Sequence, residues 1–310
     1  MTITIIIPIK PGLEPTAVQR LATLDWPREQ FELLVAEGTC PSRQRNRAVQ
    51  EARGEIIYFL DDDSLVAADA LQRLEHHFDD PQVAAVGGPS LTPAGDGLLQ
   101  RAFGTIFSSL LGAGGVRNRY RAVGEVRRTT ERELILCNLA FRRDAFLKEG
   151  GLDERLYPNE ENELLDRLSK QGLVLLHDPR LAVYRSQRPT VTAFAKQLFR
   201  YGKGRAEQTK IAGFSGLMPF VPLVFLLYLL SLPLVSCRLW YAPLALYLLA
   251  VCLCSIKTTF QLHTAAFLLL LPLLFPLAHI ANGFGLLVGF LLPLATQTCY
   301  NQPSVTIRRC

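Results

Sequence analysis

The sequence predicts an α/β domain over residues 1–210, an apolar helical region over residues 211–300 and a polar tail over residues 301–310. Two observations support this division. Short apolar runs alternate with amphipathic segments along the first region, which is typical of an α/β sheet. Charge is distributed unevenly: the chain has 33 basic and 28 acidic residues, but only Arg238 and Lys257 are charged between positions 211 and 299.

The elements of the first region follow from its hydrophobic period and from the Gly and Pro residues that bound each run. Apolar runs predict strands at residues 2–7, 31–36, 55–60, 83–86, 134–141 and 173–176. Helical spacing predicts helices at residues 15–24, 42–52, 67–78 and 160–171, with Ser42 as the N-cap of the second. This alternation predicts a mostly parallel sheet with right-handed crossovers. The glycine-rich segment 112–115 predicts a flexible loop.

The second region is apolar enough to cross a membrane. Its apolar runs cover residues 216–236, 239–256 and 264–298, and the last is interrupted near Asn282. A run of about 20 apolar residues is long enough to span a bilayer as a helix. We therefore expect a bundle of three or four transmembrane helices. The alternative is a buried helical core, which rarely contains so little charge.

The orientation follows from the segments that flank the apolar region. No signal peptide is expected, because residues 1–8 alternate like a strand and lack a basic start. Basic residues, including Lys196, Arg200, Lys203 and Lys210, precede the first run, which fits the positive-inside rule and contact with anionic membrane lipids. We expect a multi-pass protein of the inner (cytoplasmic) membrane with a cytoplasmic first domain. The net charge of +5 and the absence of a basic stripe argue against a nucleic-acid partner.

The strongest candidate for a functional site is the triplet of Asp61, Asp62 and Asp63. It follows the apolar run 55–60, and three carboxylates at the end of a buried strand must meet water, a cation or a positively charged ligand. Ligands of open α/β sheets bind beyond the carboxyl ends of strands, where an Asp-x-Asp pair can hold a divalent cation and, through it, a diphosphate. The alternative is a solvated loop that caps the next helix.

A second acidic cluster, Glu160, Glu161 and Glu163, lies in the first turn of the predicted helix 160–171. Acidic residues there stabilise the helix dipole, which is the simpler explanation. The functional alternative is a general base, because crowded carboxylates raise one another's pKa. Arg45, near the start of the predicted helix 42–52, is either a phosphate ligand or part of a solvated helix face.

Taken in order, these motifs resemble those of a family 2 inverting glycosyltransferase of GT-A fold. The residues that carry the resemblance are listed in chain order: Ile5, Ile6, Ile7, Pro8, Arg45, Asn46, Ala48, Phe59, Leu60, Asp61, Asp62, Asp63, Asn138, Ala140, Phe141, Arg142, Arg143, Gly151, Leu152, Asp153, Glu154, Asn159, Glu160, Glu161, Asn162, Glu163, Arg167, Leu168, Gln197, Arg200, Tyr201 and Gly202. The nearest subgroup is the membrane-anchored, succinoglycan-synthesis-type enzymes that build bacterial polysaccharides.

The resemblance implies a role for each matching residue. Glu161 matches the catalytic base and Asp63 the metal ligand, with Mg²⁺ or Mn²⁺ as the cofactor. The donor-binding set comprises Pro8, Glu37, Arg45, Asp61 and Asp62. The set that binds the acceptor or the diphosphate comprises Glu160, Glu163, Gln197, Arg200 and Tyr201. The chain departs from the family pattern at Tyr201, where the family has Trp, and at Glu37, where it often has Asp.

The activity that the resemblance implies is inverting transfer of a sugar from a nucleotide-diphosphate sugar, UDP-linked, to a hydroxyl of a lipid-linked or saccharide acceptor. One alternative is a transferase of the same fold that loads a sugar onto polyprenyl phosphate. Another is a non-catalytic membrane scaffold, although the apolar region has few of the ionisable groups that a transporter needs.

Overall fold

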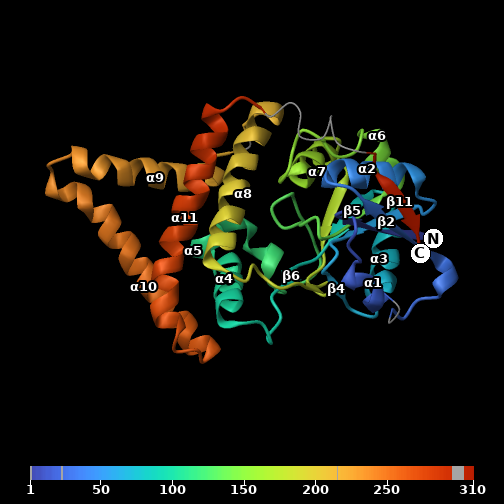
Figure 1. Cartoon of the computed structure of the whole chain (residues 1–310), viewed down its shortest axis with the longest axis horizontal. Helices are drawn as coiled ribbons and strands as arrows, with labels where there is room; N and C mark the ends of the chain where they lie inside the picture. The colour runs from blue at the N-terminus through green and yellow to red at the C-terminus, as the bar shows by residue number, and fades with distance from the viewer. Residues whose placement is uncertain (1, 22–23, 215, 295–303) are drawn as a thin grey trace. The chain divides into compact units, whose positions relative to one another are not determined.

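The structure is a computed structural model that describes residues 2–21, 24–214, 216–294 and 304–310 (Figure 1). It forms two compact units, each built from separate stretches of the chain. The first unit comprises Met1–Pro93, Asn118–Ser186 and Ala295–Cys310, and the second comprises Ala94–Arg117 and Gln187–Leu294.

A mixed sheet forms the centre of the first unit. Within the described residues it has eight strands in the order β11-β2-β1-β3-β8-β5-β9-β7. Their bounds are Thr306–Arg309, Phe31–Glu37, Ile3–Ile9, Ile56–Leu60, Asn138–Arg142, Val83–Gly87, Val174–His177 and Arg127–Arg128. The pairs β2/β1, β1/β3 and β5/β9 are parallel and the other four are antiparallel. The expectation of a mostly parallel sheet is therefore wrong, because β8 inserts antiparallel between β3 and β5.

Helices cover both faces of this sheet, which explains why its central strands are mostly apolar. Ile5 and Ile7 of β1 belong to one buried cluster, together with residues of α1 (Thr16–Leu21) and α3 (Ala70–Phe78). Ile6 belongs to the other, with residues of α2 (Pro41–Glu51), α6 (Arg143–Lys148) and α7 (Glu160–Lys170). Neighbouring residues of a strand point to opposite faces, so a strand buried on both sides has no polar face.

A strand at the end of the chain completes the sheet edge. Residues 301–310 are expected to be a polar tail, but Thr306–Arg309 pair antiparallel with β2, with Thr306 opposite Glu37 (Figure 1). Arg309 forms an ion pair with Glu32 of β2. The end of the chain therefore belongs to the same sheet as its beginning.

Two local expectations are wrong for identifiable reasons. Ser42 is not the N-cap of α2: the helix begins at Pro41 after Cys40, and the Ser42 hydroxyl donates instead to the carbonyl oxygen of Leu156 at 3.0 Å. The glycine-rich segment 112–115 is not a loop. It runs through α5 (Leu110–Ala113) into the 3₁₀ helix Gly114–Tyr120, and the Ser109 hydroxyl caps it by accepting from the Gly112 amide.

A small second sheet in the first unit lies next to the acidic triplet. Its order is β4-β10-β6, with bounds Leu65–Val66, Val183–Tyr184 and Ser90–Leu91. Strand β10 pairs antiparallel with β4, so that Tyr184 lies opposite Leu65. Arg185, which follows Tyr184, therefore lies opposite Ser64, which follows the three aspartates.

The second unit is helical. Its helices are α4 (Leu98–Ser108), α5, α8 (Val191–Ala212), α9 (Val221–Ser231), α10 (Ala242–Leu262) and α11 (Phe267–Leu291), with 3₁₀ turns at Met218–Phe220, Leu232–Leu234 and Arg238–Tyr241. Helices α8 and α11 lie side by side (Figure 1). Their backbones approach closely at glycines: a Cβ on Gly285 would lie 2.0 Å from the carbonyl oxygen of Phe199. Larger residues at these positions would separate the helices.

Two helices in the described part of the chain are long and apolar enough to cross a membrane, Arg238–Leu262 and Phe267–Leu291. The expected number of three or four is thus not reached. The first apolar run forms only the shorter helical stretch Met218–Leu234, which ends in the 3₁₀ turn Leu232–Leu234. The third run forms one continuous helix, Phe267–Leu291, and Asn282 lies within it without interrupting it. Residues 295–298 of that run lie outside the described residues.

Candidate active site

The acidic triplet lies where three neighbouring strands of the first unit end. Strands β2, β1 and β3 are parallel, and Ile9 of β1 pairs with Glu37 at the end of β2. Pro8 therefore lies beside the ends of both neighbouring strands, as expected for ligand-binding residues at one edge of a sheet. The Glu37 carboxylate accepts a hydrogen bond from the Gly12 amide at 3.2 Å, which ties the end of β2 to the loop after β1.

Arg45 connects this edge to the acidic helix α7. Its side chain is buried, and one guanidinium nitrogen donates to Asp61 Oδ1 at 2.9 Å, while the other lies 3.5 Å from Glu160 Oε1. The shorter contact shows that Asp61 holds the guanidinium more closely than Glu160 does. Arg45 is therefore a buried cation shared by the end of β3 and the start of α7, rather than part of a solvated helix face.

Arg185 binds both outer aspartates of the triplet. Its guanidinium lies 3.1 Å from Asp61 Oδ2 and donates to Asp63 Oδ1 at 2.6 Å, and its amide donates to the Leu91 carbonyl at 2.9 Å. No sequence motif predicted a role for this residue. Its approach to the triplet depends on the register between β4 and β10, and strands of two residues are too short to show a hydrophobic period.

Asp62, the middle residue of the triplet, anchors α1 through its backbone. Its carbonyl oxygen accepts from the Thr16 hydroxyl and from the Ala17 amide, both at 2.9 Å. Burial raises the pKa of the Asp62 carboxyl, and the neighbouring charges of Asp63 and Asp61 raise it further. The triplet thus combines a structural carbonyl group with three crowded carboxylates.

Glu160 is the most deeply placed acid of helix α7. Only 2% of its surface is exposed, and its Oε2 has no hydrogen-bond partner among the residues that the structure describes. Burial and the adjacent charge of Glu161 raise the pKa of the Glu160 carboxyl to about 8, although Arg45 opposes the shift. Near neutral pH the carboxyl is therefore mostly protonated, which fits its long distance to Arg45.

Glu161, the expected base, is held beside a second arginine that the sequence analysis missed. Arg119 lies 3.7 Å from the Glu161 carboxylate. It also donates to the carbonyl oxygen of Arg132 at 3.1 Å, to that of Glu131 and to the Asn162 side chain. Arg119 comes from the segment after the glycines, so its approach to α7 is a long-range contact that no local pattern predicts.

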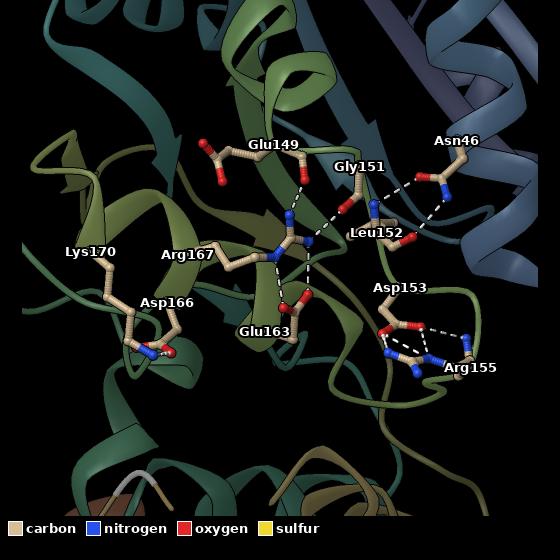
Figure 2. A network of polar contacts seen from close by, with 10 residues as sticks. All are labelled: Asn46, Glu149, Gly151, Leu152, Asp153, Arg155, Glu163, Asp166, Arg167 and Lys170. Atoms are coloured by element: carbon tan, nitrogen blue, oxygen red, sulfur yellow. Dashed lines mark hydrogen bonds and ion pairs between the residues drawn. The ribbon is translucent and has the colours of Figure 1, made fainter. Parts of the chain in front are cut away.

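Glu163 engages Arg167 one turn along α7 (Figure 2). Arg167 forms two hydrogen bonds to the Glu163 carboxylate, at 2.7 and 2.8 Å, and donates to the carbonyl oxygens of Glu149 and Gly151. Figure 2 shows this bidentate pair turned towards the segment after α6. Glu163 orients Arg167, and Arg167 holds α7 against the backbone of that segment.

The three remaining expected residues lie on α8 in the second unit. The Gln197 amide donates to the Tyr201 hydroxyl at 2.7 Å, and the Tyr201 ring lies 6.4 Å from that of Phe107. Arg200 is exposed. Gln197 and Tyr201, one helical turn apart, therefore form a preorganised polar pair on this helix.

A sequence profile described as Glycosyl transferase family group 2 matches residues 56–292, from strand β3 to the end of α11. That match covers more than half of the chain. The chain belongs to glycosyl transferase family group 2. The family expected from the motifs is thereby confirmed.

Two known proteins resemble this chain. It is 32% identical over 213 residues to the succinoglycan biosynthesis protein ExoA of Rhizobium meliloti (strain 1021), a match that covers 66% of this chain and 60% of that relative. Its fold resembles that of the mannosyltransferase PcManGT from Pyrobaculum calidifontis, solved in complex with GDP-Man and Mn²⁺. The TM-score is 0.55, with 17% identity, and the match covers 93% of this chain and 86% of that one. The fold is therefore GT-A-like and mixed α/β.

The residues at this sheet edge fit a divalent cation that is shared with a ligand. The described residues contain no group of three or more His, Cys, Asp or Glu side chains able to hold a metal by themselves. Asp61 and Asp63 offer two hard carboxylate groups at the sheet edge. Mg²⁺ is commonly held by one or two carboxylates together with substrate phosphates and water, and this donor set suits that arrangement.

We predict that Glu160 makes the stability of the protein depend on pH. Its folded-state pKa of about 8 is raised above the ordinary 4.5, so the folded state holds the proton while the unfolded state has lost it. This contribution to stability is complete below pH 4.5 and is lost as pH rises through 8. The unfolding temperature should fall over this range in the wild type, and the fall should be smaller in Glu160→Gln. Equal slopes in that variant and in an exposed control, Glu29→Gln, would contradict the prediction.

Proposed function

We propose that the protein is an inverting glycosyltransferase that moves a sugar from a nucleotide-diphosphate sugar to a hydroxyl of a lipid-linked or saccharide acceptor in polysaccharide synthesis. UDP-linked sugars are the first donors to test. The observation that carries the proposal is the buried Arg45, which links Asp61 at the end of β3 to the start of α7. It joins the carboxylates suited to a cation and diphosphate to the helix that bears Glu161.

The residues perform distinct tasks in the proposed reaction. Asp61 and Asp63 would hold Mg²⁺ or Mn²⁺, and such a cation neutralises charge on a leaving diphosphate. Pro8, Glu37 and Asp62 line the same sheet edge on the donor side. Glu161 accepts the proton of the acceptor hydroxyl, whose oxygen then forms the new bond to the anomeric carbon.

Attack from the face opposite the leaving group inverts the anomeric centre. The nucleoside diphosphate departs with the electron pair of the broken bond, and the proton stays on the Glu161 carboxylate. Gln197, Arg200 and Tyr201 remain the proposed contacts for the acceptor or the diphosphate. Binding of the acceptor or the diphosphate was also expected for Glu160 and Glu163, and for both residues this role stays a prediction. The contact of Glu163 with Arg167 supports a positioning role for Glu163 instead.

Two similarities support this assignment. The relative from Rhizobium meliloti is a succinoglycan biosynthesis protein, which favours a polysaccharide or glycolipid product. The structural relative was solved with a nucleotide sugar and Mn²⁺, which favours a nucleotide-sugar donor and a divalent cation. In this proposal, residues 1–210 carry the catalytic groups and residues 211–300 form the membrane helices, as expected from the sequence.

We also propose that the protein is a multi-pass protein of the inner membrane, in contact with membrane lipids, with a cytoplasmic catalytic domain. The helices Arg238–Leu262 and Phe267–Leu291 support two crossings. The pairing of β11 with β2 supports an even number, because both ends of the chain join one sheet and must lie on one side of a membrane. An odd number of crossings would separate these two strands.

Reporter fusions test this topology. With two crossings, reporters at Arg205 and Arg238 should both lie in the cytoplasm, and a reporter at Thr264, between the two long helices, should lie on the opposite side. The shorter stretch Met218–Leu234 then does not cross. Opposite sides for Arg205 and Arg238 would contradict this topology, because a third crossing would place β2 and β11 on opposite sides of the membrane. A cytoplasmic reporter at Thr264 would eliminate the proposed crossings.

The activity is tested with purified full-length protein and a panel of UDP- and GDP-linked sugars with Mn²⁺. We expect release of the nucleoside diphosphate to increase when a polyprenyl-diphosphate-linked saccharide is added as the acceptor. An increase with polyprenyl phosphate alone would instead identify an enzyme that loads the lipid carrier. If no donor is consumed with any acceptor, the transferase proposal is wrong.

A further inference from the structure

Arg185 is the resident counter-ion of the aspartate pair that we propose as the cation site. Its guanidinium contacts Asp61 Oδ2 at 3.1 Å and Asp63 Oδ1 at 2.6 Å, while Arg45 holds Asp61 Oδ1 at 2.9 Å. Three of the four carboxylate oxygens of the pair thus already have an arginine partner. A divalent cation requires these same oxygens.

The contacts of Arg185 differ from an ordinary surface ion pair. Its side chain is 25% exposed and its partners Asp61 and Asp63 are 22% and 48% exposed, whereas the side chains of the surface pair Arg180 and Glu125 are 68% and 85% exposed. Pairs at well-hydrated positions contribute little, but half-buried carboxylates that crowd one another need a cation nearby. Without Arg185, the repulsion among the three aspartates would be opposed chiefly by Arg45.

The backbone of Arg185 is held by hydrogen bonds, whereas its side chain is partly exposed. The Arg185 amide donates to the Leu91 carbonyl, and β10 is held between β4 and β6. Movement of the guanidinium therefore needs only new side-chain rotamers. An arginine released at this place lies beside the ligand that displaced it, and guanidinium groups bind phosphate oxygens in bidentate fashion.

We propose that Arg185 exchanges partners when the donor binds: its guanidinium leaves Asp61 and Asp63 as the donor arrives with its divalent cation, and it then binds the diphosphate of the nucleotide. This inference rests on the proposed function. Arg185 thus excludes free metal from the aspartate pair before the donor binds, and then adds a positive charge beside the leaving group.

The test measures binding of Mn²⁺ alone, by electron paramagnetic resonance, to full-length wild-type protein and to Arg185→Gln. Removal of the competing guanidinium should tighten binding of free Mn²⁺ by about tenfold, the scale of a hydrogen bond to a charged group. Binding of UDP at saturating Mn²⁺ should weaken by a similar factor, because the nucleotide loses a ligand. The exposed control Arg180→Gln should change neither affinity.

A second variant keeps the test decisive if Arg185→Gln folds poorly. Arg185→Lys keeps the charge but lacks the planar fork, so free Mn²⁺ should bind it as weakly as it binds the wild type, while UDP affinity should still fall. Unchanged affinities for both ligands in Arg185→Gln, or no Mn²⁺ binding by either protein, would overturn the proposal.

Two further outcomes separate this inference from the proposed function. UDP binding that needs no metal and is lost in Arg185→Gln would make the arginine a permanent substitute for the metal, which overturns the exchange. If free Mn²⁺ binds Arg185→Gln more tightly and UDP binds it more weakly, but no sugar is transferred, the exchange stands and only the transferase assignment fails.

Discussion

Replacement of Glu161 by glutamine is expected to lower kcat by about 10²–10⁴-fold, the usual contribution of a general base. Glutamine keeps the size of the side chain and can still lie beside Arg119, but it cannot accept the proton of the acceptor hydroxyl. Nucleotide affinity should hardly change, because the proposed role of this carboxylate concerns the acceptor. The measurement is kcat with donor and acceptor saturating, and nucleotide affinity determined in parallel.

Glu163→Gln is the matched control on the same helix. It removes half of the bidentate pair with Arg167, so we expect a lower unfolding temperature and a smaller loss of kcat. If Glu161→Gln turns over within a few-fold of the wild type while Glu163→Gln loses activity, the base is misassigned and Glu163 is the better candidate.

Replacement of Asp63 by alanine is expected to abolish turnover and the metal-dependent thermal shift that UDP produces. The variant loses one of the two carboxylate groups that suit the cation, and Arg185 loses its 2.6 Å partner. The measurements are donor turnover and unfolding temperature, each with and without Mn²⁺. Asp79→Asn, which changes an exposed aspartate on the same unit, should retain both properties.

The Asp63→Ala variant also tests whether the cation takes part in the reaction. If Asp63→Ala remains fully active without added metal, the cation is not part of the reaction. If the variant is inactive but keeps the metal-dependent shift with UDP, other groups hold the cation and Asp63 has a different task.

Much of the first unit could be predicted because its signals are local. The apolar run 55–60 is bounded by a glycine and by aspartates, and it forms β3 at Ile56–Leu60 with every residue buried. The helix expected at 160–171 forms α7 at Glu160–Lys170 for the same kind of reason, since Leu164, Leu165 and Leu168 share its buried face. Periodicity within about ten residues is enough to define such elements.

Strand direction could not be predicted in this way. The pattern of β8 is that of any buried strand, and its antiparallel insertion between β3 and β5 depends on partners that are about 50 and 80 residues away in the chain. The prediction of an N-cap at Ser42 is wrong for a related reason: its hydroxyl donates to the distant carbonyl oxygen of Leu156 instead of capping the helix.

The sequence by itself determined the chemical groups of the candidate site: the aspartate triplet, the acidic start of α7, Arg45 and the apolar helices. These follow from residue type, order and local period. Only the tertiary structure decided that Arg185 and Arg119 face those acids, and that β11 returns the chain to the first sheet. The physical reason is that such contacts arise from pairing and register between distant segments, whose free energy depends on the whole fold and leaves no local pattern.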